Sequence, residues 1–329
     1  MGRGARCTLF LVLLASLATA GSARAALPTS VAALGDSYTV ALFSGTPCAA
    51  AAVCPANSWA TGGTPAVDSH ALRLGRLGAP PAVHNFAVSG RKVADLNSGN
   101  NQAQRAINAG AQYVTIMLGL NDSCRESEAA MTTVAAFRAQ FEAGLSKLVA
   151  GLPGARIFVT SIPDAERLRM ILKDDANARS AWASQQVCSV VLDDPLSNAA
   201  AVVERRQRAR QRVIDFNRQL EEVCAQYPTC RYDGGAVFGW AFEPADFVTR
   251  DYFHLSTQGQ ASLATVTWAA THDFGSPPPP PPSPPPEAGA SYSERVMTHP
   301  SLQSYWRLGE SSGTTARDLK GGRDGTYAG

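Results

Sequence analysis

The chain has almost no excess of charge of either sign. Its 329 residues carry 29 lysines and arginines against 27 aspartates and glutamates, a formal net charge of +2. The one basic run, five arginines between Arg205 and Arg212, contains no aromatic residue and has acidic residues on both sides. Nucleic-acid surfaces combine a clear positive excess with clustered basic side chains. The sequence therefore predicts a solvated helix face at this run and no nucleic-acid partner.

A hydrophobic run long enough to cross a membrane is also missing. The apolar stretch Leu9 to Ala20 is shorter than the roughly 18 to 20 residues that a spanning helix needs. Arg3 and Arg6 precede it and Ala23-Arg24-Ala25 follows it, a pattern typical of a secretory signal peptide rather than of an uncleaved anchor. We expect residues 1–25 to be a signal peptide, and the mature protein to be extracellular with no stable membrane anchor.

No Cys-x-x-Cys pair occurs and only five histidines are present, which argues against a zinc site. Cys7 leaves with the signal peptide, and the six remaining cysteines fit three disulfides in an oxidising compartment. Six cysteines permit many connectivities. The spacing favours the pairs Cys48–Cys54, Cys224–Cys230 and, by default, Cys124–Cys188.

Short apolar runs rich in β-branched residues alternate with helical patterns. The runs are Val31–Leu34, Ala82–Ala87, Tyr113–Leu118 and Ile157–Ser161. Apolar residues from Phe137 to Leu152 recur at helical spacing before Pro153-Gly154, and Ser256-Thr257 is a natural N-cap for a closing helix. This alternation predicts a parallel sheet with helices on both faces.

Residues able to do chemistry follow three of these runs and recur in one late loop. They form the segments Gly35-Asp36-Ser37-Tyr38, Asn85 to Gly90, Gly119-Leu120-Asn121-Asp122 and Asp251-Tyr252-Phe253-His254. Parallel α/β proteins bind ligands beyond the carboxyl ends of their strands. A serine at that edge, with a histidine and an aspartate three residues before it, supplies a nucleophile, a base and an orienting carboxylate. The pattern predicts a serine hydrolase.

In this order of serine, glycine, asparagine and histidine, residues 31 to 272 resemble the SGNH (GDSL-type) esterase and lipase family. The resemblance implies a three-layer α/β/α sandwich with a central, mostly parallel five-stranded sheet of flavodoxin-like type. It also implies catalytic roles for Ser37, Asp251 and His254, and an oxyanion hole formed by Ser37, Gly90 and Asn121. Neither a metal nor an organic cofactor is expected. Tyr38 departs from the family pattern, in which leucine often follows the serine.

Rival assignments exist for the base and for the acid. His84 lies within a strand run and His70 in a variable loop, and neither combines an acidic neighbour with a late-loop position. We therefore favour His254 as the base. Asp36 and Asp122 are expected to support their loops through backbone hydrogen bonds.

Proline marks the end of the predicted catalytic domain. Residues 276–287 are nearly all proline and read as an extended linker, so the hydrolase domain should span 26–275. Beyond the linker, Tyr305 to Glu310 and Gly322 to Tyr327 resemble the opening of a LamG-like, concanavalin A-like jelly-roll domain. Because such a sandwich needs a much longer chain, we expect residues 288–329 to be an incomplete, poorly ordered segment.

The family resemblance implies ester hydrolysis but does not name the ester. A lipid or another simple carboxylic ester is our first expectation, and an acylated glycan, cleaved by a carbohydrate O-acetyl esterase, is the second. A non-catalytic secreted binding module with a hydrolase fold is the alternative of another class. Two insertions, residues 43–78 and 164–197, are candidates for substrate selection, although the second is equally consistent with packing against the sheet. No coiled-coil pattern indicates an oligomer, and we expect a monomer.

Overall fold

The computed structural model describes residues 26–48, 52–275, 297, 302–306, 308 and 312–327. The predicted signal peptide and proline-rich linker lie outside these residues. The chain divides into two compact units, residues 1–275 and 276–329. In the second unit, strands β6 (Thr315–Ala316) and β7 (Gly325–Thr326) pair in antiparallel fashion. The LamG-like resemblance of this unit stays a prediction.

A five-stranded sheet forms the centre of the first unit. Its strands are β1 (Ser30–Gly35), β2 (Ala82–Asn85), β3 (Tyr113–Met117), β4 (Arg156–Val159) and β5 (Cys230–Tyr232). They lie in the order β2-β1-β3-β4-β5, and every pairing is parallel. The three-layer fold predicted from the sequence is confirmed. Because Gly35 pairs in register with Met117, the residues that follow β1 and β3 emerge at the same edge.

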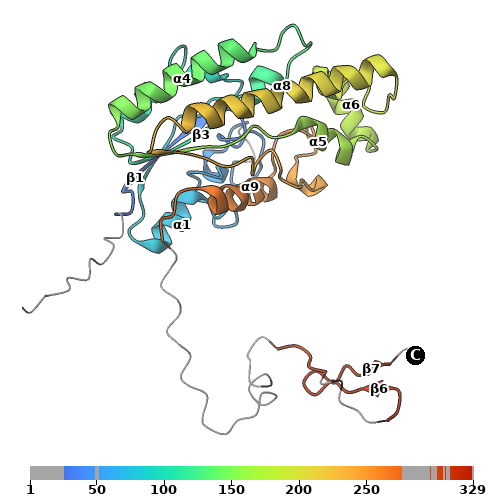
Figure 1. Ribbon diagram of the computed structural model, residues 1–329. Helices are drawn as coiled ribbons and strands as arrows, with labels where there is room; N and C mark the ends of the chain where they lie inside the picture. The colour runs from blue at the N-terminus through green and yellow to red at the C-terminus, as the bar shows by residue number, and fades with distance from the viewer. Residues whose placement is uncertain are drawn as a thin grey trace, which may run out of the picture. The chain divides into compact units, whose positions relative to one another are not determined.

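Helices cover both faces of this sheet. Helices α4 and α8 lie over one face, and α1 and α9 lie over the other (Figure 1). Strands β1 and β3 are buried almost throughout, as expected for parallel strands covered on both sides. The helices are α1 (His70–Leu77), α2 (Gln102–Asn108), α3 (Leu120–Ser123), α4 (Val134–Gly151), α5 (Ala165–Leu172), α6 (Ala176–Gln185), α7 (Ser189–Leu192), α8 (Ala200–Cys224) and α9 (Thr257–Ala270), with short 3₁₀ turns η1 (Pro55–Asn57), η2 (Val93–Leu96) and η3 (Pro244–Asp246).

Side-chain capping explains where the two helices anticipated from the sequence begin. The Thr133 hydroxyl accepts a hydrogen bond from the Ala136 N–H at the start of α4, and Ser256 accepts one from the Gly259 N–H at the start of α9. Each cap satisfies a backbone donor that the first turn leaves free. Helix α9 begins three residues after His254, so its cap also fixes the end of the late loop.

The prediction of a solvated face at the basic run on α8 holds for Arg208, whose side chain is 56% exposed, but not for Arg206. Arg206 is 4% exposed and donates to the carbonyl oxygens of Asp194 and Ser197. The other four arginines also bond to neighbouring segments: Arg205 to Asp193, Arg208 to Glu128, Arg210 to Asp164 and Arg212 to Thr132. These hydrogen bonds attach α8 to the segments around it, and in the buried Arg206 they also satisfy donors that need partners.

Three disulfides cross-link the first unit: Cys48–Cys54, Cys124–Cys188 and Cys224–Cys230. The bridge from Cys124 to Cys188 spans 64 residues and joins the end of α3 to the start of α7. Among the described residues, no helix is both long and apolar enough to span a bilayer.

Candidate active site

The serine of the first motif lies in a tight turn at the end of β1. A Cβ on Gly35 would lie 2.3 Å from the Thr39 hydroxyl oxygen and 2.9 Å from the Met117 carbonyl oxygen, so this position requires glycine. Asp36 braces the turn by accepting the Tyr38 N–H on its Oδ1, at 3.0 Å. Ser37 is consequently held at the carboxyl edge of the sheet, where it is 4% exposed.

The late loop places a histidine and an aspartate beside this serine. His254 Nε2 lies 2.9 Å from Ser37 Oγ, and His254 Nδ1 lies 2.6 Å from Asp251 Oδ2. The second carboxylate oxygen of Asp251 accepts the backbone N–H groups of Phe253 and His254, each at 3.0 Å. Three side chains from opposite ends of the unit thus form one hydrogen-bonded series.

The surroundings of Asp251 favour its ionised form. Burial is the largest influence and acts to raise the pKa of this carboxyl. The hydrogen bond and charge interaction with His254, together with the two backbone N–H donors, outweigh burial and lower the pKa. Asp251 is therefore suited to accept a hydrogen bond from the imidazole and to fix its orientation.

The two remaining motifs converge on the same edge. Asn121 Nδ2 donates to Asp36 Oδ2 and to the Arg91 carbonyl oxygen, both at 3.1 Å. Gly90, directly before Arg91, has a φ of +78°, a conformation that glycine adopts without strain. The amide of Asn121 thereby joins the serine turn to the Gly90 loop, and both of its N–H groups are engaged in doing so.

Asp122 contributes to this arrangement from the neighbouring position. Its carboxylate accepts the Val93 N–H at 2.9 Å and the Thr132 hydroxyl at 2.8 Å. Burial raises its pKa. The residue links α3 to the 3₁₀ turn η2 and to the segment before α4, as expected from the sequence for a supporting role.

Asp36 is buried beside this cluster, and its ionisation should affect stability. Burial raises its pKa from 3.8 to about 7, although the Tyr38 N–H, His254 and the Asn121 amide act in the opposite direction. When the pKa of a carboxyl is higher in the folded protein than in the unfolded chain, the unfolding free energy falls as the pH rises from the unfolded-state pKa to the folded-state pKa. We expect the unfolding free energy of the wild type to fall between about pH 4 and pH 7 relative to Asp36→Asn, by at most about 4 kcal/mol.

Urea unfolding of both proteins at several pH values checks this prediction. The substitution also changes the hydrogen bond to Asn121, but that contribution is independent of pH and cancels in the comparison. Parallel pH profiles for the two proteins would contradict a raised pKa at Asp36.

The two rival histidines do not approach Ser37. His84 lies in β2 and stacks on Phe86. His70, predicted to lie in a variable loop, is instead the first residue of α1 and is fully buried. Its ring nitrogens lie 2.8 Å from the Tyr113 hydroxyl and 2.9 Å from that of Thr267. Burial is the largest influence on His70 and lowers its pKa to about 3. Its neutral imidazole therefore joins the Tyr113 and Thr267 hydroxyl groups within the core.

Sequence reasoning missed two aromatic residues that contact the late loop. The Tyr38 hydroxyl donates to the Phe253 carbonyl oxygen at 2.7 Å, and its ring lies edge-on to that of His254. The ring of Phe43 also lies edge-on to His254, at 5.6 Å between centroids, and the Arg250 guanidinium lies over the Phe43 ring at 4.2 Å from its centroid. The departure from the family pattern at Tyr38 could have indicated a special role for this residue. Nothing in the sequence around Phe43 indicated its contact with His254.

The segment 164–197 supplies packing side chains. Leu168, Leu172 and Trp182 are each less than 5% exposed and belong to the main core. Met170, by contrast, is 52% exposed. This burial favours the packing interpretation over an acyl pocket lined by these core residues.

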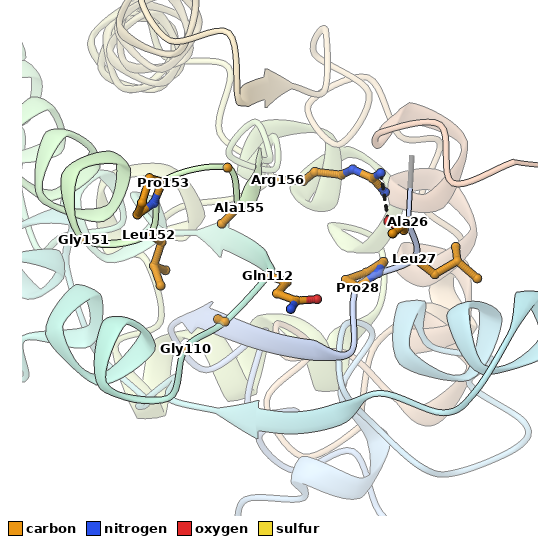
Figure 2. Close-up of a pocket in the computed structure, with 12 residues that line it drawn as sticks. Ala26, Leu27, Pro28, Gly110, Gln112, Gly151, Leu152, Pro153, Ala155 and Arg156 are labelled. Atoms are coloured by element: carbon orange, nitrogen blue, oxygen red, sulfur yellow. Dashed lines mark hydrogen bonds between the residues drawn. The ribbon is translucent and has the colours of Figure 1, made fainter. Parts of the chain in front are cut away.

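A hollow of about 610 Å³ lies at the opposite edge of the sheet, where β1, β3 and β4 begin. Figure 2 shows Arg156 reaching the Ala26 carbonyl oxygen there, in a hydrogen bond of 3.2 Å. None of the residues proposed from the sequence for catalysis lines it. Nor do the described residues hold a cluster of three or more histidine, cysteine, aspartate or glutamate side chains arranged for a metal ion.

A parallel three-layer fold thus joins a serine, a histidine and an aspartate at its carboxyl edge, the geometry of a serine hydrolase. The family model described as GDSL-like Lipase/Acylhydrolase matches residues 31–266. The chain belongs to this family and is a carboxylic ester hydrolase. A search of curated proteins found no match.

Several solved structures are similar to the chain. A lipase/acylhydrolase from Enterococcus faecalis is 19% identical, with a TM-score of 0.41 over 72% of this chain and 92% of its own. Phospholipase A1 from Streptomyces albidoflavus NA297 is 15% identical, with a TM-score of 0.44 over 74% and 100%. An active-site mutant of a family two carbohydrate esterase from Clostridium thermocellum is 13% identical, with a TM-score of 0.43 over 73% and 62%.

Proposed function

We propose that the protein is a secreted serine esterase or lipase that forms an acyl-enzyme on Ser37. The observation that carries this proposal is the hydrogen-bonded series from Ser37 through His254 to Asp251, with spacings of 2.9 and 2.6 Å. Hydrogen-bond reach between nucleophile and base, and between base and orienting carboxylate, is what nucleophilic catalysis requires.

The reaction proceeds in two halves. Ser37 Oγ attacks the ester carbonyl carbon while His254 Nε2 takes the hydroxyl proton, and Asp251 stabilises the imidazolium that forms. The tetrahedral intermediate collapses, and His254 returns the proton to the departing alcohol. Water then attacks the acyl-enzyme with His254 again as base, which releases the carboxylic acid and restores Ser37.

The negative charge on the carbonyl oxygen requires donors in place beforehand. We assign this role to the backbone N–H groups of Ser37 and Gly90 and to the Asn121 side-chain amide. Because both N–H groups of Asn121 already have partners, the amide must share one of them with the substrate oxygen.

Asn121→Ala is expected to lower kcat by about 10²- to 10³-fold, the usual cost of one lost oxyanion donor. The matched control is Asn217→Ala, which removes a buried amide that bonds to Ile162 and not to the serine turn. Steady-state kinetics on a p-nitrophenyl ester measure both effects. Equal kcat values for Asn121→Ala and the wild type would remove this residue from the oxyanion hole.

The proposed domain plan and location follow from the sequence. We propose a signal peptide over residues 1–25, a hydrolase domain over 26–275, a linker over 276–287 and an incomplete LamG-like segment over 288–329. Three disulfides support an oxidising, extracellular destination. We propose that the enzyme acts as a monomer.

The LamG-like resemblance of the tail is the observation that favours a second candidate, a carbohydrate O-acetyl esterase. Hydrolysis of p-nitrophenyl esters from acetyl to palmitoyl by the protein beginning at Ala26, alongside release of acetate from acetylated xylan, tests both. A preference for long acyl chains supports a lipase, and acetate release with activity confined to the acetyl ester supports the glycan esterase. Inactivity on every substrate would contradict the proposed function.

A further inference from the structure

The loop that carries Asp251 and His254 contains a residue in an unfavourable backbone conformation. Tyr252, between Asp251 and Phe253, has a φ of +54°, in the left-handed region that residues other than glycine rarely adopt. Such a conformation persists only when surrounding contacts hold it. Its N–H donates to the Val248 carbonyl oxygen at 2.9 Å. Its carbonyl oxygen accepts a hydrogen bond from a different part of the chain.

Helix α6 supplies the partners on both sides of Asp251. The indole Nε1–H of Trp182 donates to the Tyr252 carbonyl oxygen at 3.2 Å, and Gln185 Nε2 donates to the Arg250 carbonyl oxygen at 2.9 Å. The carbonyl groups directly before and after Asp251 therefore both bond to one helix. Trp182 is fully buried, so water does not reach its indole N–H.

The end of α6 is itself attached to the site from another direction. Cys188, three residues beyond Gln185, is bonded to Cys124, which follows the Asn121 helix α3. The Val190 N–H also donates to the Arg125 carbonyl oxygen at 2.9 Å. The segment from Trp182 in α6 to Val190 in α7 therefore connects the Asp251 loop with the residues that follow α3, two parts of the site that come from different segments of the chain.

We propose that Trp182, assisted by Gln185, is a positioning residue that holds the Asp251–His254 loop in its catalytic conformation. Its effect passes through the Tyr252 peptide and not through contact with the substrate. The inference rests on the proposed function of the triad. Because a misplacement of about 1 Å can cost about a hundredfold in rate, we expect Trp182→Phe to lower kcat by about 10- to 100-fold and to leave KM within about twofold.

The chain offers a matched control in Trp59. This residue is also fully buried, but its indole N–H has no hydrogen-bond partner among the described residues. Trp59→Phe removes the same ring volume without removing a hydrogen bond, and it should leave kcat within about twofold of the wild type. Thermal unfolding of both variants shows whether their losses of stability are comparable.

A second variant avoids the core altogether. Gln185 is exposed at the end of α6, so Gln185→Ala leaves no cavity and keeps a good helix former. It removes one of the two hydrogen bonds to the loop, and a two- to tenfold loss of kcat with KM unchanged is expected. This variant tests the inference even if Trp182→Phe fails to fold.

Hydrogen exchange provides a readout that does not depend on activity. The amides of Tyr252, Phe253 and His254 are all hydrogen-bonded within the loop. They should exchange faster in Trp182→Phe and Gln185→Ala than in the wild type. In Trp59→Phe their exchange rates should equal those of the wild type. Faster exchange with lower kcat supports the positioning role; wild-type kcat and exchange in both α6 variants, or equal losses in Trp182→Phe and Trp59→Phe, would overturn it.

Failure of the proposed function gives a different result. In that case the wild type hydrolyses no ester and does not react at Ser37 with a fluorophosphonate probe. The exchange comparison among the variants still decides whether α6 holds the loop.

Discussion

Ser37→Ala is expected to abolish ester hydrolysis, with a fall in kcat of about 10⁴- to 10⁶-fold. The substitution removes one oxygen atom from a nearly buried residue, and with it the proposed nucleophile at 2.9 Å from the imidazole. No other described hydroxyl group is hydrogen-bonded to His254. Initial rates on a p-nitrophenyl ester and labelling by a fluorophosphonate probe measure the loss.

The matched control is Ser161→Ala. Ser161 follows β4 at the same edge of the sheet and is fully buried, but its hydroxyl donates to Asp233 at 2.8 Å and accepts the Phe238 N–H. It should retain activity while losing some stability. Wild-type rates in Ser37→Ala, or an equal loss of activity in the two variants, would remove Ser37 as nucleophile.

The second large effect concerns the base and its orienting carboxylate. His254→Ala should lower kcat nearly as far as Ser37→Ala, because Ser37 then has no group to take its proton. Asp251→Asn should lower kcat by about 10³- to 10⁴-fold and leave measurable activity. The amide presents an N–H where the imidazole needs an acceptor, although its oxygen still accepts the backbone N–H groups of Phe253 and His254.

The ranking of these two variants is the informative result. Steady-state kinetics with circular dichroism as a folding control establish it. The proposed roles require His254→Ala to be the less active protein. If Asp251→Asn were the less active of two folded variants, or if either matched the wild type, the assignment of base and orienter would be wrong.

Local pattern was enough to locate most of the sheet. The runs beginning at Val31 and Tyr113 stood out because both faces of those strands are buried, which leaves an uninterrupted apolar sequence. Strand β5 was not located from its own residues: it is three residues long, with Arg231 exposed between two partly buried residues, so it is too short to show an apolar run or a repeated alternation. Its place in the sheet was anticipated only through the family resemblance.

The residues of the site likewise differ in whether local sequence pattern could indicate their place. Ser37 and the Asp251–His254 pair, which the structure brings within hydrogen-bond distance, could be proposed from the sequence because the turn and the three-residue spacing are local. His70 was misplaced because its hydrogen-bond partners, Tyr113 and Thr267, lie 43 and 197 residues away. No local signal distinguishes such a histidine from one in a loop.

The sequence by itself determined the parallel α/β architecture, the two close cysteine pairs and the residues able to supply nucleophile, base and acid, because these depend on periodicity and on short spacings. Only the tertiary structure decided how those residues are held. The bond from Asn121 to Asp36 spans 85 residues, and that from Trp182 to Tyr252 spans 70. Such contacts depend on where whole helices pack, and packing is set by the shape of the complete core and not by any one segment.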